Sequence, residues 1–117
     1  MQLLLFLAAL LAASPHARTP VSKAPVRTAS LQNPYDSQDT AIRAGAKLFQ
    51  RHCASCHGQD AAGRNQAPAL ASTEVRNAPP GALFWVLRNG SLRHGMPSFS
   101  HLPEQQRWQI VTYLKTL

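Results

Sequence analysis

The sequence is short of cysteine and of aromatic residues, and each shortage narrows what the chain can be. Only two of the 117 residues are cysteines, so the second pair of ligands that a structural zinc site usually needs is missing. Aromatic residues make up 7% of the chain. A domain this small often needs a disulfide, a metal or a cofactor to supplement its core. We therefore expect one small domain that is stabilised by more than its own side chains.

Acidic side chains are also scarce. Five aspartates and glutamates face twelve lysines and arginines, which gives a formal net charge of +7. Such a charge favours encounters with acidic surfaces. The basic residues are scattered along the chain instead of being clustered on one element, which argues against nucleic acid as a partner. We therefore expect partners with acidic docking surfaces, and no nucleic acid.

No hydrophobic run is long enough to cross a bilayer, which takes about 20 residues. The apolar run from Leu3 to Ala13 is typical of the central part of a secretory signal peptide, although no lysine or arginine precedes it. We predict a signal peptide over 1–17 and export to the periplasm, with no transmembrane span after its removal. A leader that stays uncleaved would act as a membrane tether.

Residues 18–36 contain too little apolar surface to offset the entropy of ordering. Three prolines interrupt this segment, and Arg18, Lys23 and Arg27 keep it solvated. The composition predicts a flexible basic linker, disordered or extended, before a domain that spans 37–117.

Three helices and no strand are expected, because the alternation of apolar and polar residues that marks a strand is absent. Apolar residues recur at helical spacing over 38–51. A second helix is predicted over 79–90, where Pro80 suits the first turn and Gly90 suits the end. A third begins near 103. The sequence therefore predicts an all-α domain of three main helices joined by long loops.

The two cysteines stand in the stretch HCASCHG, and a histidine directly follows the second. A redox-active Cys-x-x-Cys pair normally follows a strand and opens a helix, whereas this pair follows a helix and opens a loop. A structural disulfide here would close only a tiny loop and add little stability. Zinc would need a fourth ligand from an isolated histidine.

Covalent haem attachment explains the spacing best, because Cys-x-x-Cys-His is the c-type haem attachment sequence. Cys53 and Cys56 can add to the two vinyl groups of one porphyrin, which lie on adjacent pyrroles, and His57 then lies under the iron. We therefore predict one haem c that is bound through both cysteines, with His57 as an axial iron ligand. We predict no catalytic residues.

The second axial position needs another ligand or stays open. Met96 is the only methionine outside the leader, and Gly95 and Pro97 beside it allow a close, stiff turn. A lone methionine more often fills a gap in a core, and His94 and His101 are rival ligands. With a haem attached, Met96 is favoured. A thioether ligand raises the reduction potential, and two filled axial positions leave only electron exchange.

With these motifs the sequence resembles the class I c-type cytochromes, in particular the small bacterial mono-haem domains. The resemblance covers roughly 38–117. Gly45 to Phe49 is similar to the glycine and aromatic pair of the family's first helix, and Ile110 to Tyr113 is similar to the apolar and aromatic pair of its last helix. The resemblance implies the cytochrome c fold around one covalently attached haem, with these two helices crossing closely at the glycine.

One loop of the family is also matched. Ala67 to Leu70 resembles the loop whose proline carbonyl accepts a hydrogen bond from the proximal histidine. The resemblance therefore implies that Pro68 orients His57 without touching the iron.

The function expected is that of a carrier that shuttles single electrons between a periplasmic dehydrogenase or reductase and a terminal oxidase. Arg51, Arg64 and Arg93 are expected around the exposed haem edge, where they would give a weak, salt-sensitive contact. A dedicated cytochrome subunit of a dehydrogenase complex, tied to it by residues 18–34, is the alternative. A haem sensor or a peroxidase-like enzyme would need an open sixth site, and the sequence offers no obvious distal acid or base for peroxide chemistry.

Overall fold

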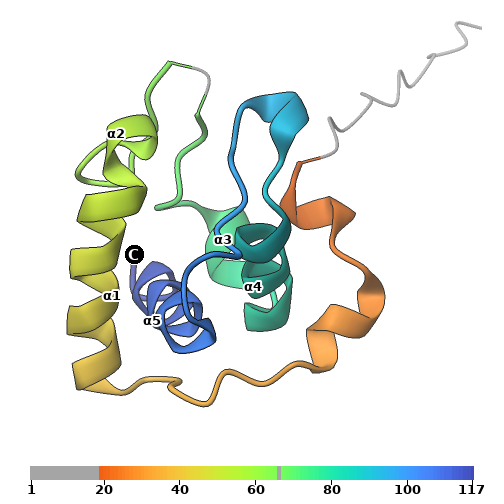
Figure 1. Ribbon diagram of the computed structural model, residues 1–117, viewed down its shortest axis with the longest axis vertical. Helices are drawn as coiled ribbons and strands as arrows, with labels where there is room; N and C mark the ends of the chain where they lie inside the picture. The colour runs from red at the N-terminus through yellow and green to blue at the C-terminus, as the bar shows by residue number, and fades with distance from the viewer. Residues whose placement is uncertain (1–18, 66) are drawn as a thin grey trace, which may run out of the picture.

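The computed structural model describes residues 19–65 and 67–117, and every regular element within them is helical (Figure 1). Three 3₁₀ helices and five α-helices follow one another: η1 (Val21–Lys23), η2 (Val26–Ser30), α1 (Asp39–His52), α2 (Ala54–His57), α3 (Thr73–Asn77), α4 (Pro80–Asn89), η3 (Leu92–His94) and α5 (Glu104–Leu114). The described residues form no sheet and only two isolated β-bridges. The predicted all-α class and the three main helices, α1, α4 and α5, are confirmed. The predicted signal peptide over 1–17 lies outside the described residues.

The close crossing of α1 and α5 is the main contact of the fold. Gly45 lies at this crossing, where a Cβ atom would stand 2.0 Å from the carbonyl oxygen of Gln109 and 2.8 Å from the Cβ of Tyr113. Only a residue without a side chain lets the two backbones come so close. The rings of Phe49 and Tyr113 meet beside it, with their centroids 5.4 Å apart. The crossing implied by the family resemblance is therefore present.

The helix α4 begins and ends where its sequence predicts. Pro80 occupies the first turn, where its missing N–H has no partner to lose. Gly90 ends the helix with φ of +67°, and its N–H donates to the carbonyl of Val86. The apolar face of α4 packs against α5, where the rings of Phe84 and Trp108 stack with their centroids 4.0 Å apart. This packing places the loop after Gly90 at a fixed end of the core.

The segment before α1 is folded onto the domain, so the prediction of a disordered or extended linker is wrong for its described part, residues 19–36. Both η1 and η2 contact α4, and Thr28 is only 6% exposed. A Cβ atom on Gly81 would lie 1.8 Å from the carbonyl oxygen of Thr28, so the two backbones are in close contact. The side-chain amide of Asn33 donates to the hydroxyl of Thr112 at 2.8 Å. Figure 1 shows this N-terminal arm, residues 19–36, running around α4 before it reaches α1.

The composition of the arm misleads because few of its hydrophobic side chains, those of Val21 and Tyr35, pack against the hydrophobic core. A glycine in α4 and the arm's own backbone make the contact, and a threonine supplies the buried side chain. Such close approach depends on the absence of a side chain, which hydropathy does not register.

The short helix α3 is absent from the sequence-based expectation. Ser72 caps its first turn by accepting a hydrogen bond from the N–H of Val75 at 3.3 Å. The ammonium group of Lys115, at the end of α5, donates to the carbonyls of Arg76 and of Ala78, the latter at 2.8 Å. Lys115 thereby ties the C-terminus of α5 to the C-terminus of α3.

No helix of the part of the chain that the structure describes is long and apolar enough to cross a membrane.

Candidate haem-binding site

The cysteine motif forms a compact turn directly after α1. The N–H of Cys53 still donates to the carbonyl of Phe49 at 2.8 Å, and the N–H of His57 donates to the carbonyl of Cys53 at 3.0 Å. The short helix α2 therefore carries the Cys56 thiol and the His57 imidazole, and Cys53 lies at the junction between α1 and α2. Cys53 is 7% exposed and belongs to the hydrophobic core, whereas Cys56 is exposed. The two thiols thus have different surroundings within one turn.

Burial raises the pKa of the Cys53 thiol to about 11, and the nearby Cys56 contributes to the rise. A redox-active Cys-x-x-Cys pair works through a thiolate whose pKa is lowered. Burial of Cys53 has the opposite effect on the thiol pKa. This environment disfavours the dithiol alternative.

A zinc site is disfavoured by the placement of the other candidate ligands. Within residues 19–65 and 67–117, no three histidine, cysteine or acidic side chains come together in a group that could hold a metal ion. A structural zinc site needs four such ligands.

The imidazole of His57 is oriented by the loop that follows it. Its Nδ1 lies 2.8 Å from the carbonyl oxygen of Pro68. A carbonyl oxygen can only accept, so Nδ1 carries the proton and Nε2 keeps its lone pair in the neutral ring. This is the contact that the resemblance implied for Pro68.

Backbone contacts hold this loop close to α2. The N–H of Gly63 donates to the carbonyl of His57 at 2.8 Å, and a Cβ atom on Gly63 would lie 2.9 Å from the N of Ala69. The N–H of Leu70 donates to the carbonyl of Ala61 at 2.8 Å. The Pro68 carbonyl is therefore fixed relative to His57 by the backbone on both sides of it.

Met96 lies in a closed loop at the end of α4. It forms an antiparallel bridge with Ser91, in which each N–H donates to the other residue's carbonyl at 2.9 and 3.0 Å. Gly95, with φ of +75°, makes the turn that the bridge needs. Beyond the loop, the N–H of Phe99 donates to the carbonyl of Leu87 at 2.8 Å. The Met96 backbone is thus held from both ends.

The side chain of Met96 is half-buried and packs against the same hydrophobic cluster that contains Cys53. The two rival histidines, His94 and His101, are both exposed. His94 also engages its Nδ1 with the hydroxyl of Ser91 at 2.7 Å. His101 contacts the core residue Phe99 with the ring centroids 6.0 Å apart but stays exposed, so Met96 is the half-buried one of the three candidates for the second axial position.

One neighbour of the site was not expected from the sequence. The ring of His52, the last residue of α1, lies edge-on to Phe99 with the ring centroids 6.3 Å apart. Because Phe99 follows the Met96 loop, this contact links the cysteine side of the site to the methionine side. No periodicity signals it, since the two residues lie on separate elements.

Comparison with known proteins decides the family. The family described as cytochrome c oxidase, cbb3-type, subunit III matches residues 40–114, which include the cysteine motif and the Met96 loop. The chain belongs to this family of c-type cytochromes. The resemblance to class I c-type cytochromes is thereby confirmed, and membership implies a covalently bound haem c.

Two related c-type cytochromes agree with this placement. Cytochrome c550 of Pseudomonas aeruginosa is 30% identical over 90 residues, which are 74% of this chain and 62% of that protein. The crystal structure of cytochrome CL from the marine methylotrophic bacterium Methylophaga aminisulfidivorans matches with a TM-score of 0.63 and 31% identity, over 73% of this chain and 58% of that one. The chain thus spans about three fifths of the length of either relative.

The residues present suit the cofactor that the family implies. Two thiols and an imidazole share one turn, the imidazole has its Nε2 lone pair free, and a half-buried thioether is held in a fixed loop. In this donor set nitrogen and sulfur can both serve haem iron. In Figure 1 the loop after α2 and the loop after α4 extend to the same end of the molecule.

Proposed function

We propose that the chain is a mono-haem electron carrier in which Cys53 and Cys56 hold the porphyrin covalently, while His57 and Met96 are the axial iron ligands. When bound, the haem supplies one-electron exchange between ferric and ferrous iron. The protein's own residues attach it, orient its ligands and limit access to the metal.

The hydrogen bond between His57 Nδ1 and the Pro68 carbonyl carries this proposal. It fixes the tautomer and the ring plane of His57. A metal-binding histidine is typically oriented by a partner of this kind on its other nitrogen. Because the proton is on Nδ1, the lone pair of Nε2 can bind a metal. A histidine with only a structural role would not need this tautomer.

Met96 as the sixth ligand would close the iron to small molecules. The thioether favours ferrous iron and so raises the reduction potential. A closed site is what an electron carrier needs. A haem sensor or a peroxidase-like enzyme would need an open sixth position where its ligand can bind the iron.

The partners are proposed to be periplasmic redox proteins with acidic surfaces, and the chain is proposed to be exported by its N-terminal leader. Arg51, Arg64 and Arg93 are exposed in the structure, on or near the elements that carry the haem ligands. A contact through such rim charges is steered by electrostatics and weakens as salt screens it. The alternative of a subunit tethered through the arm receives no support from the arm's position, because residues 19–36 pack on this domain instead of extending from it.

Haem attachment can be tested on the exported protein by mass spectrometry under denaturing conditions. We expect one haem to remain with the wild-type chain and none to remain with a Cys53→Ser, Cys56→Ser variant. His101→Ala, which removes an exposed histidine, is the matched control and should keep its haem. A wild-type chain that loses the haem on denaturation would refute covalent attachment.

A further inference from the structure

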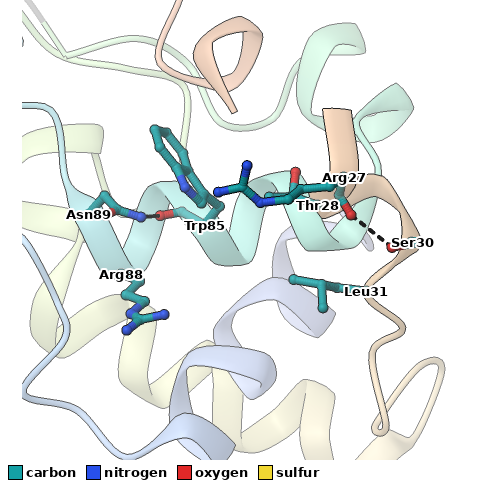
Figure 2. Close-up of a pocket in the computed structure, with 7 residues that line it drawn as sticks. All are labelled: Arg27, Thr28, Ser30, Leu31, Trp85, Arg88 and Asn89. Carbon is teal, nitrogen blue, oxygen red and sulfur yellow. Dashed lines mark hydrogen bonds between the residues drawn. The ribbon is translucent and has the colours of Figure 1, made fainter. Parts of the chain in front are cut away.

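An open pocket of about 570 Å³ lies between the N-terminal arm and α4 (Figure 2). Arg27 and its neighbours in η2 form one side, and Trp85, Arg88 and Asn89 form the other. Two arginines from separate segments thus border one cavity, and neither is part of the haem-binding site. The pocket exists only because the arm is folded against α4.

Three polar side chains of this arm pocket already use a hydrogen-bond donor within the chain. The hydroxyl of Ser30 donates to the carbonyl of Arg27 at 2.8 Å, the hydroxyl of Thr28 donates to the carbonyl of Pro25 at 2.6 Å, and the amide of Asn89 donates to the carbonyl of Trp85 at 2.8 Å. These three donors are therefore already engaged within the chain.

The two guanidinium groups and the indole N–H remain. Among residues 19–65 and 67–117, no carboxylate forms an ion pair with Arg27 or Arg88, and no side chain or carbonyl accepts from the indole N–H of Trp85. No acidic residue lines the pocket. Guanidinium groups bind carboxylates and phosphates through paired, charge-assisted hydrogen bonds. The chemistry of the pocket therefore fits an anion.

The layout favours several anionic groups along a segment over one small anion. Figure 2 shows the guanidinium of Arg27 reaching across toward Trp85, while the side chain of Arg88 extends in another direction from α4. Both arginines are exposed, and Val26 next to Arg27 is 92% exposed. Sites for small molecules enclose most of their ligand, whereas exposed arginines beside a half-buried tryptophan are typical of a protein interface.

We propose that the arm pocket is a docking site for an acidic segment of a partner protein, with Arg27 and Arg88 pairing with its carboxylates and Trp85 packing against it. The partner's role as a redox protein rests on the function proposed above, but binding of the acidic segment does not.

The pocket is joined to the haem site through the backbone. The carbonyl of Arg88 accepts a hydrogen bond from the hydroxyl of Ser98 at 2.5 Å, and Ser98 lies two residues after Met96. Arg51 and Arg64, by contrast, belong to the end of α1 and to the loop after α2. A segment bound in the arm pocket would therefore hold a partner beside the methionine loop while leaving the cysteine side free.

The test is a nuclear magnetic resonance titration of the haem-loaded, reduced protein with a synthetic peptide of ten glutamates. The indole N–H signal of Trp85 reports on the pocket, and that of the buried Trp108 is the internal reference. We expect the Trp85 signal to shift and the Trp108 signal to stay. An Arg27→Gln, Arg88→Gln variant should bind the peptide roughly tenfold more weakly, since it lacks both charged anchors.

The matched control is an Arg43→Gln, Lys47→Gln variant, which loses two charges on the exposed side of α1 and should bind the peptide nearly as well as wild type. Equal weakening in both variants would overturn the proposal, because net charge alone would then explain binding. Weakening in the control only would also overturn it, because the peptide would then bind along α1 instead of in the arm pocket.

Inorganic phosphate separates a small-anion site from a docking site. If phosphate shifts the Trp85 signal as strongly as the peptide at equal concentration, the acidic-segment proposal is refuted. The optical spectrum of the same samples tests the haem ligation separately, and neither arginine variant should change it. Failure of peptide binding with a normal spectrum would count against the arm pocket alone.

Discussion

Replacing Gly45 by alanine should weaken the domain at the crossing of α1 and α5. The added Cβ would stand 2.0 Å from the carbonyl oxygen of Gln109 and 2.8 Å from the Cβ of Tyr113. An ordinary carbon–oxygen contact is about 3.3 Å or longer. The two helices would therefore have to separate by roughly 1.3 Å. Neither obstructing atom belongs to the end of a flexible side chain, so local rotation cannot relieve the clash.

Two opposing terms set the size of the effect. Overpacking of a close contact costs about 3 kcal/mol at the upper end of its range, and the rigid backbone atoms here place it near that end. Alanine in place of glycine returns about 1 kcal/mol through helix propensity. The net loss is about 2 kcal/mol, which corresponds to a decrease in Tm of roughly 8–16 °C for a domain of about this size.

The assay is urea unfolding of the haem-loaded protein, followed by far-ultraviolet circular dichroism. Arg43→Ala is the control, because Arg43 is exposed on the same helix and surface substitutions usually change stability by less than about 0.5 kcal/mol. If Gly45→Ala unfolds at the same urea concentration as Arg43→Ala, the two backbones are not in close contact at this glycine.

Two further substitutions test the arm and the Lys115 contact. Gly81→Ala would place a Cβ atom 1.8 Å from the Thr28 carbonyl oxygen, so the arm should detach and trypsin should cleave after Arg27 much faster than in wild type. The exposed substitution Ala29→Ser is the control. Cleavage of the Gly81→Ala variant at the wild-type rate would contradict the packing of the arm on α4. Burial lowers the pKa of Lys115 from 10.5, while the charge of Asp36 opposes the shift. The folded chain therefore releases this proton first, and the free energy of unfolding should rise with pH between the lowered value and 10.5. In Lys115→Met, measured by urea unfolding at several pH values, this rise should disappear. The free energy of unfolding at neutral pH should also fall by about 1–2 kcal/mol, because the carbonyls at the end of α3 lose their donor. An identical pH slope in the variant would refute the assignment of the slope to Lys115.

The sequence was most informative where a residue type has one strong physical meaning. The cysteine and histidine spacing predicted the turn that α2 forms, and Pro80 and Gly90 predicted both ends of α4. For these features local geometry alone requires the residue. The contact of Gly45 with α5, by contrast, was implied by the family resemblance, and the structure contains it.

The sequence was least informative where the contact depends on distant backbone. The arm is held by a carbonyl of Thr28 against Gly81 and by a hydrogen bond from Asn33 to Thr112, and neither leaves a hydrophobic pattern. The cap of α3 by Lys115 joins residues that are far apart in the chain. Composition therefore suggested disorder in a segment that tertiary contacts order.

The most direct test of the central claim is an optical spectrum of the haem-loaded protein and of its Met96→Ala variant, with and without carbon monoxide. A His57 and Met96 ligand pair predicts a low-spin wild type with the weak sulfur-to-iron charge-transfer band, which carbon monoxide leaves unchanged. The variant should lose that band and bind carbon monoxide in its ferrous form. A high-spin wild type that binds carbon monoxide readily would contradict a closed electron carrier.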